Sequence, residues 1–173
     1  MASGAKNFEQ FYTQHFGKVF RFVFFRCNGD RALAEDLVSE IFLKALNHFA
    51  AYDEARSRSA WIMTITRHHL ANFWRDRKPT VALDAFGGSE AEGEGTPAEP
   101  WSVATSRLAQ EQKAATLEAQ EFLAKLAPNE REIVTLHYLA GYSYAEIAEL
   151  VGSTAGAVKV AAHRAIKRLR DFL

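Results

Sequence analysis

Apolar residues recur every three or four positions along both ends of the chain, a spacing that is typical of amphipathic helices. Proline is absent from residues 1–78, and runs of β-branched residues there are short. We expect no sheet, so the pattern predicts an all-α protein. The expected helices cover residues 5–27, 31–49, 60–77, 107–126, 130–139, 144–150 and 155–172.

Several of these helices begin or end at residues that favour helix termini. The expected N-terminal caps are polar residues, two of them with a glutamate three positions later: Asp30, Asn129 with Glu132, and Ser143 with Glu146. Gly29 and Gly141 follow expected helix ends, where a left-handed backbone favours glycine. The caps therefore support the helix boundaries that the apolar spacing predicts.

Residues 79–110 separate two helical parts of the chain. This stretch holds three of the four prolines, several glycines and few branched apolar residues, which favours a flexible, extended segment. We therefore expect two small helical domains, at residues 1–78 and 111–173, joined by a flexible acidic linker at 79–110. A solvated tether and an acidic strand lying in a basic channel of a partner both remain open for this linker.

The net charge of zero is an average over parts of opposite charge. Residues 1–78 hold 12 basic and 8 acidic residues, whereas the linker holds one base and five acids. The stretch from Thr154 to Arg170 holds five Lys and Arg residues and no acid. Charge asymmetry of this kind indicates a nucleic-acid partner that the total conceals.

The C-terminal sequence SYAEIAELVGSTAGAVKVAAHRAIKRLRDFL is typical of a helix-turn-helix motif. A short helix ends at a turn on Gly152, and Thr154 or Ser153 caps the longer helix that follows. On a helical projection, apolar residues from Val158 to Phe172 share one face, which we expect to be buried.

The opposite face of that longer helix, with its cap, supplies the expected DNA contacts: Thr154, Lys159, Val160, His163, Arg164 and Lys167. Residues near the start of such a helix reach base edges in the major groove, and later cations hold phosphates. Val160 either contacts a thymine methyl group or is an isolated exposed valine.

Two faces in the N-terminal part also carry candidate binding residues. The helix at 31–49 has an acidic strip with a leucine in its middle, which suits a protein partner with a basic helix and an apolar notch: Asp36, Ser39, Glu40, Leu43 and Asn47. The helix at 60–77 and the polar loop before it expose cations, an amide and an indole, which suit nucleic acid: Arg56, Arg58, Trp61, Thr64, Arg67, His68, Asn72 and Arg75.

Together these segments resemble the extracytoplasmic-function (ECF) group of bacterial sigma factors, the promoter-recognition subunits of RNA polymerase. AEDLVSEIFLKAL is similar to the region 2 helix that docks on the clamp coiled coil of the largest polymerase subunit. FAAYDEARSRSAWIMTITRHHLANFWRDR is similar to the segment that melts and reads the minus-10 element. LAPNEREIVTLHYLAGYSYAEIAELVGSTAGAVKVAAHRAIKRLR is similar to region 4, which reads the minus-35 element.

The resemblance implies an alternative sigma factor that acts in the cytoplasm, with core RNA polymerase, promoter DNA and an anti-sigma factor as partners. It places Asp36, Glu40 and Leu43 on the polymerase-binding helix. Residues 53–59, with His68 and Asn72, fall where the family captures and reads the minus-10 strand, and Lys159, His163 and Arg164 fall on the helix that reads the minus-35 element. Three positions depart from the family pattern: Ser39 where glutamine is common, His68 where asparagine is common, and Val160-Ala161 in place of a frequent Ser-Arg pair. The departure at Val160-Ala161 concerns the upstream promoter sequence that is read, not the role of the helix.

Two other functions in transcription remain open at this stage. One is an autonomous helix-turn-helix regulator, although nothing before residue 79 has the alternating strands and helices of a receiver domain. The other is a sigma-like decoy for an anti-sigma factor, although the basic recognition face that a decoy would lose is present.

Composition argues against most other classes of protein. We expect no catalysis, cofactor or metal, because His15, His68 and His69 lack metal-ligand spacing and a nearby nucleophile. The single cysteine, Cys27, excludes a disulfide framework and fits a reducing cytoplasm. No apolar run has the length of a membrane span, and no signal peptide is evident.

Overall fold

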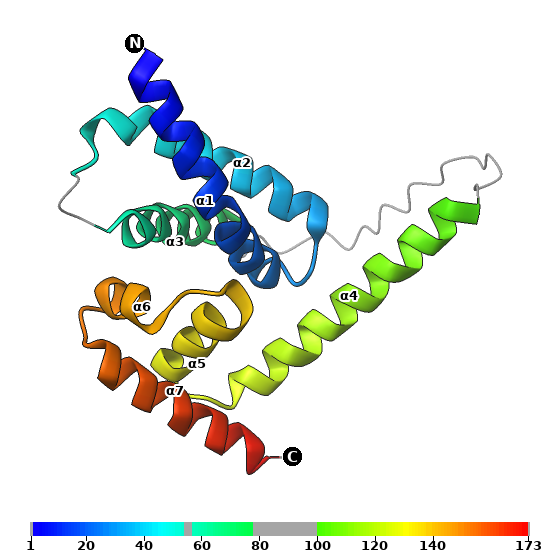
Figure 1. Ribbon diagram of the computed structural model, residues 1–173. Coiled ribbons are helices and arrows are strands. Elements are labelled where there is room, and N and C mark those ends of the chain that lie inside the picture. The colour runs from blue at the N-terminus through cyan, green and yellow to red at the C-terminus, as the bar shows by residue number, and fades with distance from the viewer. Residues whose placement is uncertain (1, 54–56, 78–99, 173) are drawn as a thin grey trace.

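The computed structural model describes residues 2–53, 57–77 and 100–172; within these ranges it describes side chains from residue 7 onward and, in the fourth helix, from residue 108. All regular elements in these ranges are helices, as the apolar spacing predicts (Figure 1). In chain order they are α1 (Ala2–Arg26), α2 (Arg31–His48), η1 (Phe49–Ala51), α3 (Arg58–Arg77), α4 (Pro100–Ala124), α5 (Pro128–Val134), η2 (Thr135–Ala140), α6 (Tyr144–Val151) and α7 (Ala155–Arg170).

Helices α1, α2 and α3 pack around an aromatic core. Phe11 is fully buried, and its ring lies 5.6 Å from that of Trp61 and 5.2 Å from that of Phe49, measured between centroids. Asp30 caps α2 as expected, because its carboxylate accepts a hydrogen bond from the Leu33 amide at 3.1 Å. The cap and the buried face together fix which side of α2 faces solvent.

Helices α5, η2, α6 and α7 form the second group, with α6 and α7 as the helix-turn-helix. Ser143 and Glu146 form the expected capping box at the start of α6. Gly152 ends α6 with a φ of 66°, and the Thr154 hydroxyl accepts from the Ala157 amide to cap α7. The glycine is required there because a left-handed backbone strains other residues.

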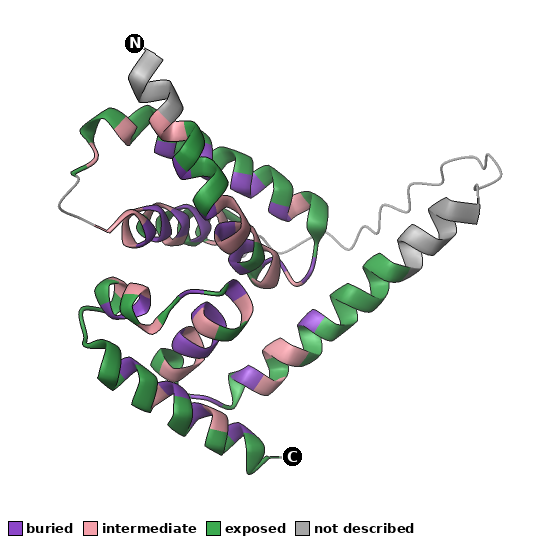
Figure 2. Cartoon of the chain, in the orientation of Figure 1, coloured by how far each residue is buried: buried purple, intermediate pink, exposed green. Residues whose placement is uncertain are grey.

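The two groups of helices lie against each other (Figure 1), and both contain buried positions (Figure 2). One continuous apolar cluster runs through both groups. Helix α1 packs on η2, and α3 packs on α6. Buried residues of the cluster come from the N-terminal group, such as Val19 and Ile62, and from the C-terminal group, such as Leu136 and Ile147. The sequence pattern predicts two domains but contains no indication that they pack together.

Three expectations about local structure are wrong. Asn129 does not cap α5, because Pro128, whose fixed φ suits the first turn, starts the helix one residue earlier after Ala127. Helix α4 begins at Pro100 rather than at residue 107, so residues 100–106 of the expected linker are also helical, while 78–99 lie outside the described residues. Phe172 lies beyond the end of α7 and is exposed, with the Lys125 ammonium 5.2 Å from its ring.

Candidate nucleic-acid and protein interfaces

The predicted DNA-contacting residues lie on the exposed face of α7 and at its N-cap. All six are exposed: Thr154, Lys159, Val160, His163, Arg164 and Lys167. Val158, Ala162, Ala165 and Leu169 are buried on the other face and hold the helix against α5 and α6. The face therefore combines cations with one half-exposed valine, which is a surface that fits the major groove.

One base of the uninterrupted C-terminal run has an acidic partner that the sequence pattern does not reveal. The Arg168 guanidinium lies 2.7 Å from the Glu130 carboxylate of α5. Its charge is therefore shared with an acid from another helix. The cations that lead the helix, Lys159 and Arg164, have no ion pair to an acid in the described part of the chain.

Helix α2 exposes the whole acidic strip: Asp36, Ser39, Glu40, Leu43 and Asn47. Leu43 has 60% of its surface exposed, the largest fraction among the described large apolar residues. Leu46, which sequence reasoning missed, is 48% exposed and lies three residues further along the same helix. Its position at the edge of the strip is the signal that would have found it.

The acidic strip is connected to α3 through a buried histidine that sequence reasoning missed. His69 Nε2 lies 3.1 Å from the Glu40 carboxylate, and His69 Nδ1 lies 2.7 Å from the Lys44 ammonium. Burial, together with the positive charge of Lys44, lowers the pKa of His69, against the opposing effect of Glu40. His69 is therefore part of the structure that holds this side of α2, rather than a reader of DNA.

Helix α3 carries the predicted minus-10 residues along one stripe, because positions 58, 61, 64, 68, 72 and 75 fall on the same side of a helix. Thr64, His68, Asn72 and Arg75 are exposed. Trp61 is only half-buried, and its ring packs against Phe11, Phe49 and Tyr52. Arg56 lies outside the described residues.

Arg67, at the edge of this stripe, contacts the C-terminal group of helices. Its guanidinium lies 2.8 Å from the Glu132 carboxylate of α5. Arg58, at the other end, donates to the Asn7 side chain of α1 at 3.3 Å. The structure thus leaves most of the stripe open and places α5 beside Arg67.

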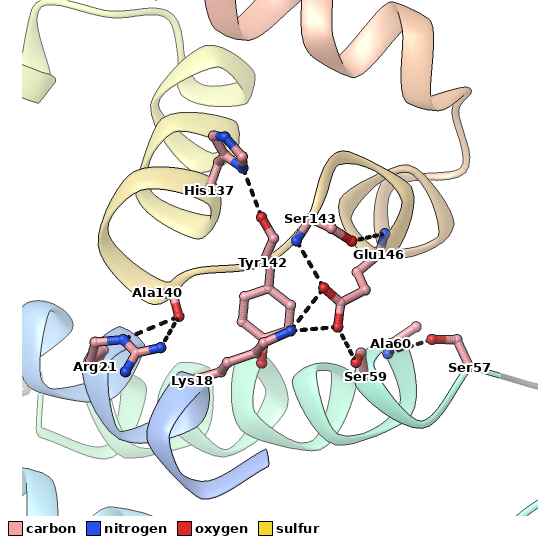
Figure 3. A network of polar contacts seen from close by, with 10 residues as sticks. All are labelled: Lys18, Arg21, Ser57, Ser59, Ala60, His137, Ala140, Tyr142, Ser143 and Glu146. Carbon is pink, nitrogen blue, oxygen red and sulfur yellow. Dashed lines mark hydrogen bonds and ion pairs between the residues drawn. The ribbon is translucent and has the colours of Figure 1, made fainter. Parts of the chain in front are cut away.

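Glu146 forms the centre of a polar network between the two groups of helices (Figure 3). Its carboxylate accepts from the Lys18 ammonium at 2.7 and 2.9 Å and from the Ser59 hydroxyl at 2.5 Å. It also accepts from the Ser143 amide at 2.8 Å, as part of the α6 capping box. One side chain therefore caps α6 and joins it to α1 and α3.

The hydrogen bonds to Glu146 determine its charge state. Burial alone would raise the pKa of Glu146, but the bonds from Lys18, Ser59 and Ser143 outweigh burial and lower this pKa to about 2. The carboxylate is therefore ionised at neutral pH, and it forms an ion pair with Lys18.

Two more contacts of α1 reinforce the same junction. Arg21 donates from Nε and Nη2 to the Ala140 carbonyl, at 3.3 and 2.9 Å, where η2 ends. The next residue, Gly141, has a φ of 84°, and a Cβ on it would come within 3.0 Å of the Arg21 guanidinium. The Lys18 ammonium also lies 5.0 Å from the centre of the Tyr142 ring.

Comparison with known proteins identifies the family. Residues 11–80 match the family described as "Sigma-70 region 2", and residues 116–169 match "Sigma-70, region 4". The ECF RNA polymerase sigma factor SigL of Mycobacterium tuberculosis is 30% identical over 92% of this chain and 84% of its own length. This chain belongs to the ECF group of the sigma-70 family.

Another ECF relative agrees with that assignment, and two solved structures are similar to the chain in fold. The ECF RNA polymerase sigma factor BldN of Streptomyces coelicolor is 32% identical over 99% of this chain, and the chain spans 62% of that relative's length. In fold, this sigma factor is similar to CnrH in complex with the cytosolic domain of CnrY (TM-score 0.60, 20% identity, covering 97% of this chain and 88% of that one). It is also similar to the sigma factor RpoE of Bartonella quintana in complex with the anti-sigma factor NepR (TM-score 0.57, 22% identity, 96% of each chain).

The described part of the sigma factor holds neither a helix suited to span a membrane nor a cluster suited to bind a metal ion. None of its helices combines the length and apolar character of a membrane-spanning segment. Nor do three or more of its described His, Cys, Asp and Glu residues gather in a way that could hold a metal ion.

Proposed function

We propose that this ECF sigma factor binds core RNA polymerase in the cytoplasm and directs it to promoters through DNA contacts of regions 2 and 4. The observation that carries the proposal is the pairing, in one chain, of the cationic α7 face with the acidic, leucine-centred strip of α2. A regulator that acts alone needs the first surface but has no use for the second.

The C-terminal helices supply the minus-35 contacts in this proposal. Helix α7 enters the major groove with Lys159, His163 and Arg164 nearest the base edges, while Thr154 and Lys167 contact the backbone. Val160, half exposed between these cations, contacts a thymine methyl group.

The α3 stripe supplies the minus-10 contacts. Opening DNA costs roughly 1.4 kcal/mol per stacking step, and capture of unstacked bases returns about 1–3 kcal/mol for each base that stacks on a side chain. Trp61 is the aromatic side chain of the stripe, while His68 and Asn72 are positioned to hydrogen-bond base edges. The phosphates of the strand are held by the cations and one hydroxyl of this segment: Arg56, Arg58, Thr64, Arg67 and Arg75.

The domain organisation belongs to the same proposal. Region 2 occupies residues 1–78 and region 4 occupies 111–173, with 79–110 as the connection, of which residues 100–110 start α4. The minus-10 and minus-35 elements lie about 25 base pairs apart, or roughly 85 Å at 3.4 Å per base pair. A domain of this size is roughly 30 Å across, so the two regions must separate before both elements are read.

An anti-sigma factor is the proposed regulator. In one solved structure of similar fold, CnrH is bound to the cytosolic domain of CnrY. In the other, the sigma factor RpoE is bound to the anti-sigma factor NepR. An anti-sigma partner would act by covering the surfaces that the polymerase needs.

The α2 strip gives the first test of the proposal. The double variant Asp36→Ala with Leu43→Ala should reduce retention of the full chain on core polymerase at least about tenfold, because the acidic and apolar contacts are lost together. Both side chains are exposed, so thermal unfolding should stay unchanged. Retention is measured by co-purification with core polymerase.

A matched control is Leu108→Ala, which removes another exposed leucine from α4. It should be retained like the wild type. If core polymerase retains the α2 double variant as well as the wild type, the chain does not bind the polymerase through this strip.

A further inference from the structure

Three cations of region 2 contact region 4, each at an acceptor of negative character. Lys18 of α1 contacts the Glu146 carboxylate at 2.7 Å, and Arg67 of α3 contacts the Glu132 carboxylate at 2.8 Å. Arg21 of α1 donates two hydrogen bonds to the Ala140 carbonyl. Region 4 therefore presents a set of negative groups to a cationic surface of region 2.

The chemistry of these contacts is the chemistry of phosphate binding. Lysine and arginine bind phosphate oxygens through the same charge-assisted hydrogen bonds that they form with carboxylates. The Ala140 carbonyl stands at the C-terminal end of η2, where aligned peptide dipoles place partial negative charge. Two carboxylates and a helix C-terminus thus occupy the places that backbone phosphates would take.

The position of these cations connects them with DNA. Arg67 borders the α3 stripe, next to His68 and one turn from Thr64, which are among the proposed minus-10 residues. Ser59, on the first turn of α3, shares the Glu146 carboxylate with Lys18. Separation of regions 2 and 4, which the promoter requires, would leave Lys18, Arg21 and Arg67 without these negative partners, and Arg67 would then stand free at the edge of that stripe.

We propose that Lys18, Arg21 and Arg67 form a phosphate-binding surface whose cations are paired with region 4 in the closed form seen here and contact promoter DNA in the open form. Region 4 and DNA then compete for the same cations, so the closed contact limits DNA binding until the regions separate. This inference rests on the proposed function, and it adds Lys18 and Arg21 to the DNA-binding residues.

A matched set of full-length variants separates DNA binding from simple closure. Glu146→Gln removes the charge that holds Lys18 and keeps a side chain that can complete the α6 capping box. Glu149→Gln is the control, because it makes the same charge change at an exposed site on the same helix. The double variant Lys18→Gln with Glu146→Gln removes the cation from the opened protein.

Binding is measured by fluorescence anisotropy with a short fluorescein-labelled DNA duplex of mixed sequence, over a series of salt concentrations. Glu146→Gln should bind at least about threefold more tightly than the wild type, because more of the protein is open. Glu149→Gln should bind like the wild type. The double variant should bind more weakly than Glu146→Gln, and the slope of its log affinity against log salt should be smaller by about 1.

Two results would overturn the proposal. If the double variant binds as tightly as Glu146→Gln with the same salt slope, Lys18 holds region 4 but does not contact phosphate. If Glu146→Gln and Glu149→Gln bind alike, closure does not limit DNA binding. Ser59→Ala removes the Ser59 hydrogen bond to Glu146 and so weakens the same contact from the region 2 side. It should therefore tighten DNA binding, as Glu146→Gln does. Agreement between these two variants would show that the effect of Glu146→Gln does not come from misfolding.

The experiments can show that Lys18 does not bind phosphate while the proposed function as a sigma factor still holds. Polymerase retention through Asp36 and Leu43 involves neither Lys18 nor Glu146, so it can succeed when the duplex measurement fails. Absence of duplex binding by every variant would overturn this inference alone, provided that the chain still supports transcription by core polymerase.

Discussion

At the scale of single residues, this sigma factor combines several roles in a few polar side chains at the contacts between helices. Glu146 caps α6 and also holds Lys18 and Ser59, so one carboxylate fixes a local and a long-range feature. His15, in contrast to Glu146, is a buried polar side chain without hydrogen bonds among the described residues. It is 4% exposed on α1 and packs on the Phe11 ring, and neither ring nitrogen has a hydrogen-bond partner among the described residues.

His15 should make stability depend on pH. Burial, and then the charge of Lys18, lower the pKa of His15 below its ordinary value of 6.5. The unfolded chain therefore binds this proton more readily, and the free energy of unfolding falls as pH drops through about 6.5 toward the folded-state pKa. His69, with its lowered pKa, acts in the same direction.

Two substitutions of His15 separate titration from polarity. His15→Leu and His15→Gln should both reduce the loss of stability between pH 7 and 5.5, but only the leucine should raise stability at pH 7, by about 1 kcal/mol, because no buried polar group remains. Thermal unfolding followed by circular dichroism measures both effects. A pH dependence equal to that of the wild type in both variants would contradict the role of His15.

At the scale of elements, α7 separates a packing face from a binding face. Its buried residues recur at helical spacing against α5 and α6, and its cations face solvent. Because the proposed contacts with DNA use only the exposed face, substitutions there should affect binding without affecting folding.

The variant Lys159→Ala with Arg164→Ala tests this separation. It should reduce promoter affinity of the polymerase holoenzyme by at least about tenfold and lower the salt dependence of binding, because two cations are lost. Lys113→Ala, at an exposed site on α4, is the control. Unchanged affinity and unchanged transcription from a dependent promoter would show that α7 is not the recognition helix.

The elements were predictable from sequence wherever the information is local. Apolar spacing predicted the helices, and Asp30, Ser143 and Thr154 cap them as expected. Exposure of the α2 strip and the α7 face followed from the same spacing, although their roles remain proposals. The start of α5 was misplaced because Pro128 outweighs Asn129 as a start signal.

At the scale of the whole molecule, the closed packing of regions 2 and 4 was beyond sequence reasoning. Lys18 and Glu146 are 128 positions apart, and no periodic pattern relates them. The partners of Arg67 and Arg168 are acids on other helices, which a count of charges along the chain cannot assign. The net charge of zero conceals these pairs as well as the cationic α7 face.

Transcription in vitro with core polymerase, over a pool of genomic fragments, tests most directly whether this chain is a promoter-selecting subunit of RNA polymerase. Polymerase with the chain should start at a discrete set of sites that share two upstream motifs, and these transcripts should be absent with core alone. If the chain is bound to the polymerase but the transcripts are the same with and without it, the chain does not select promoters.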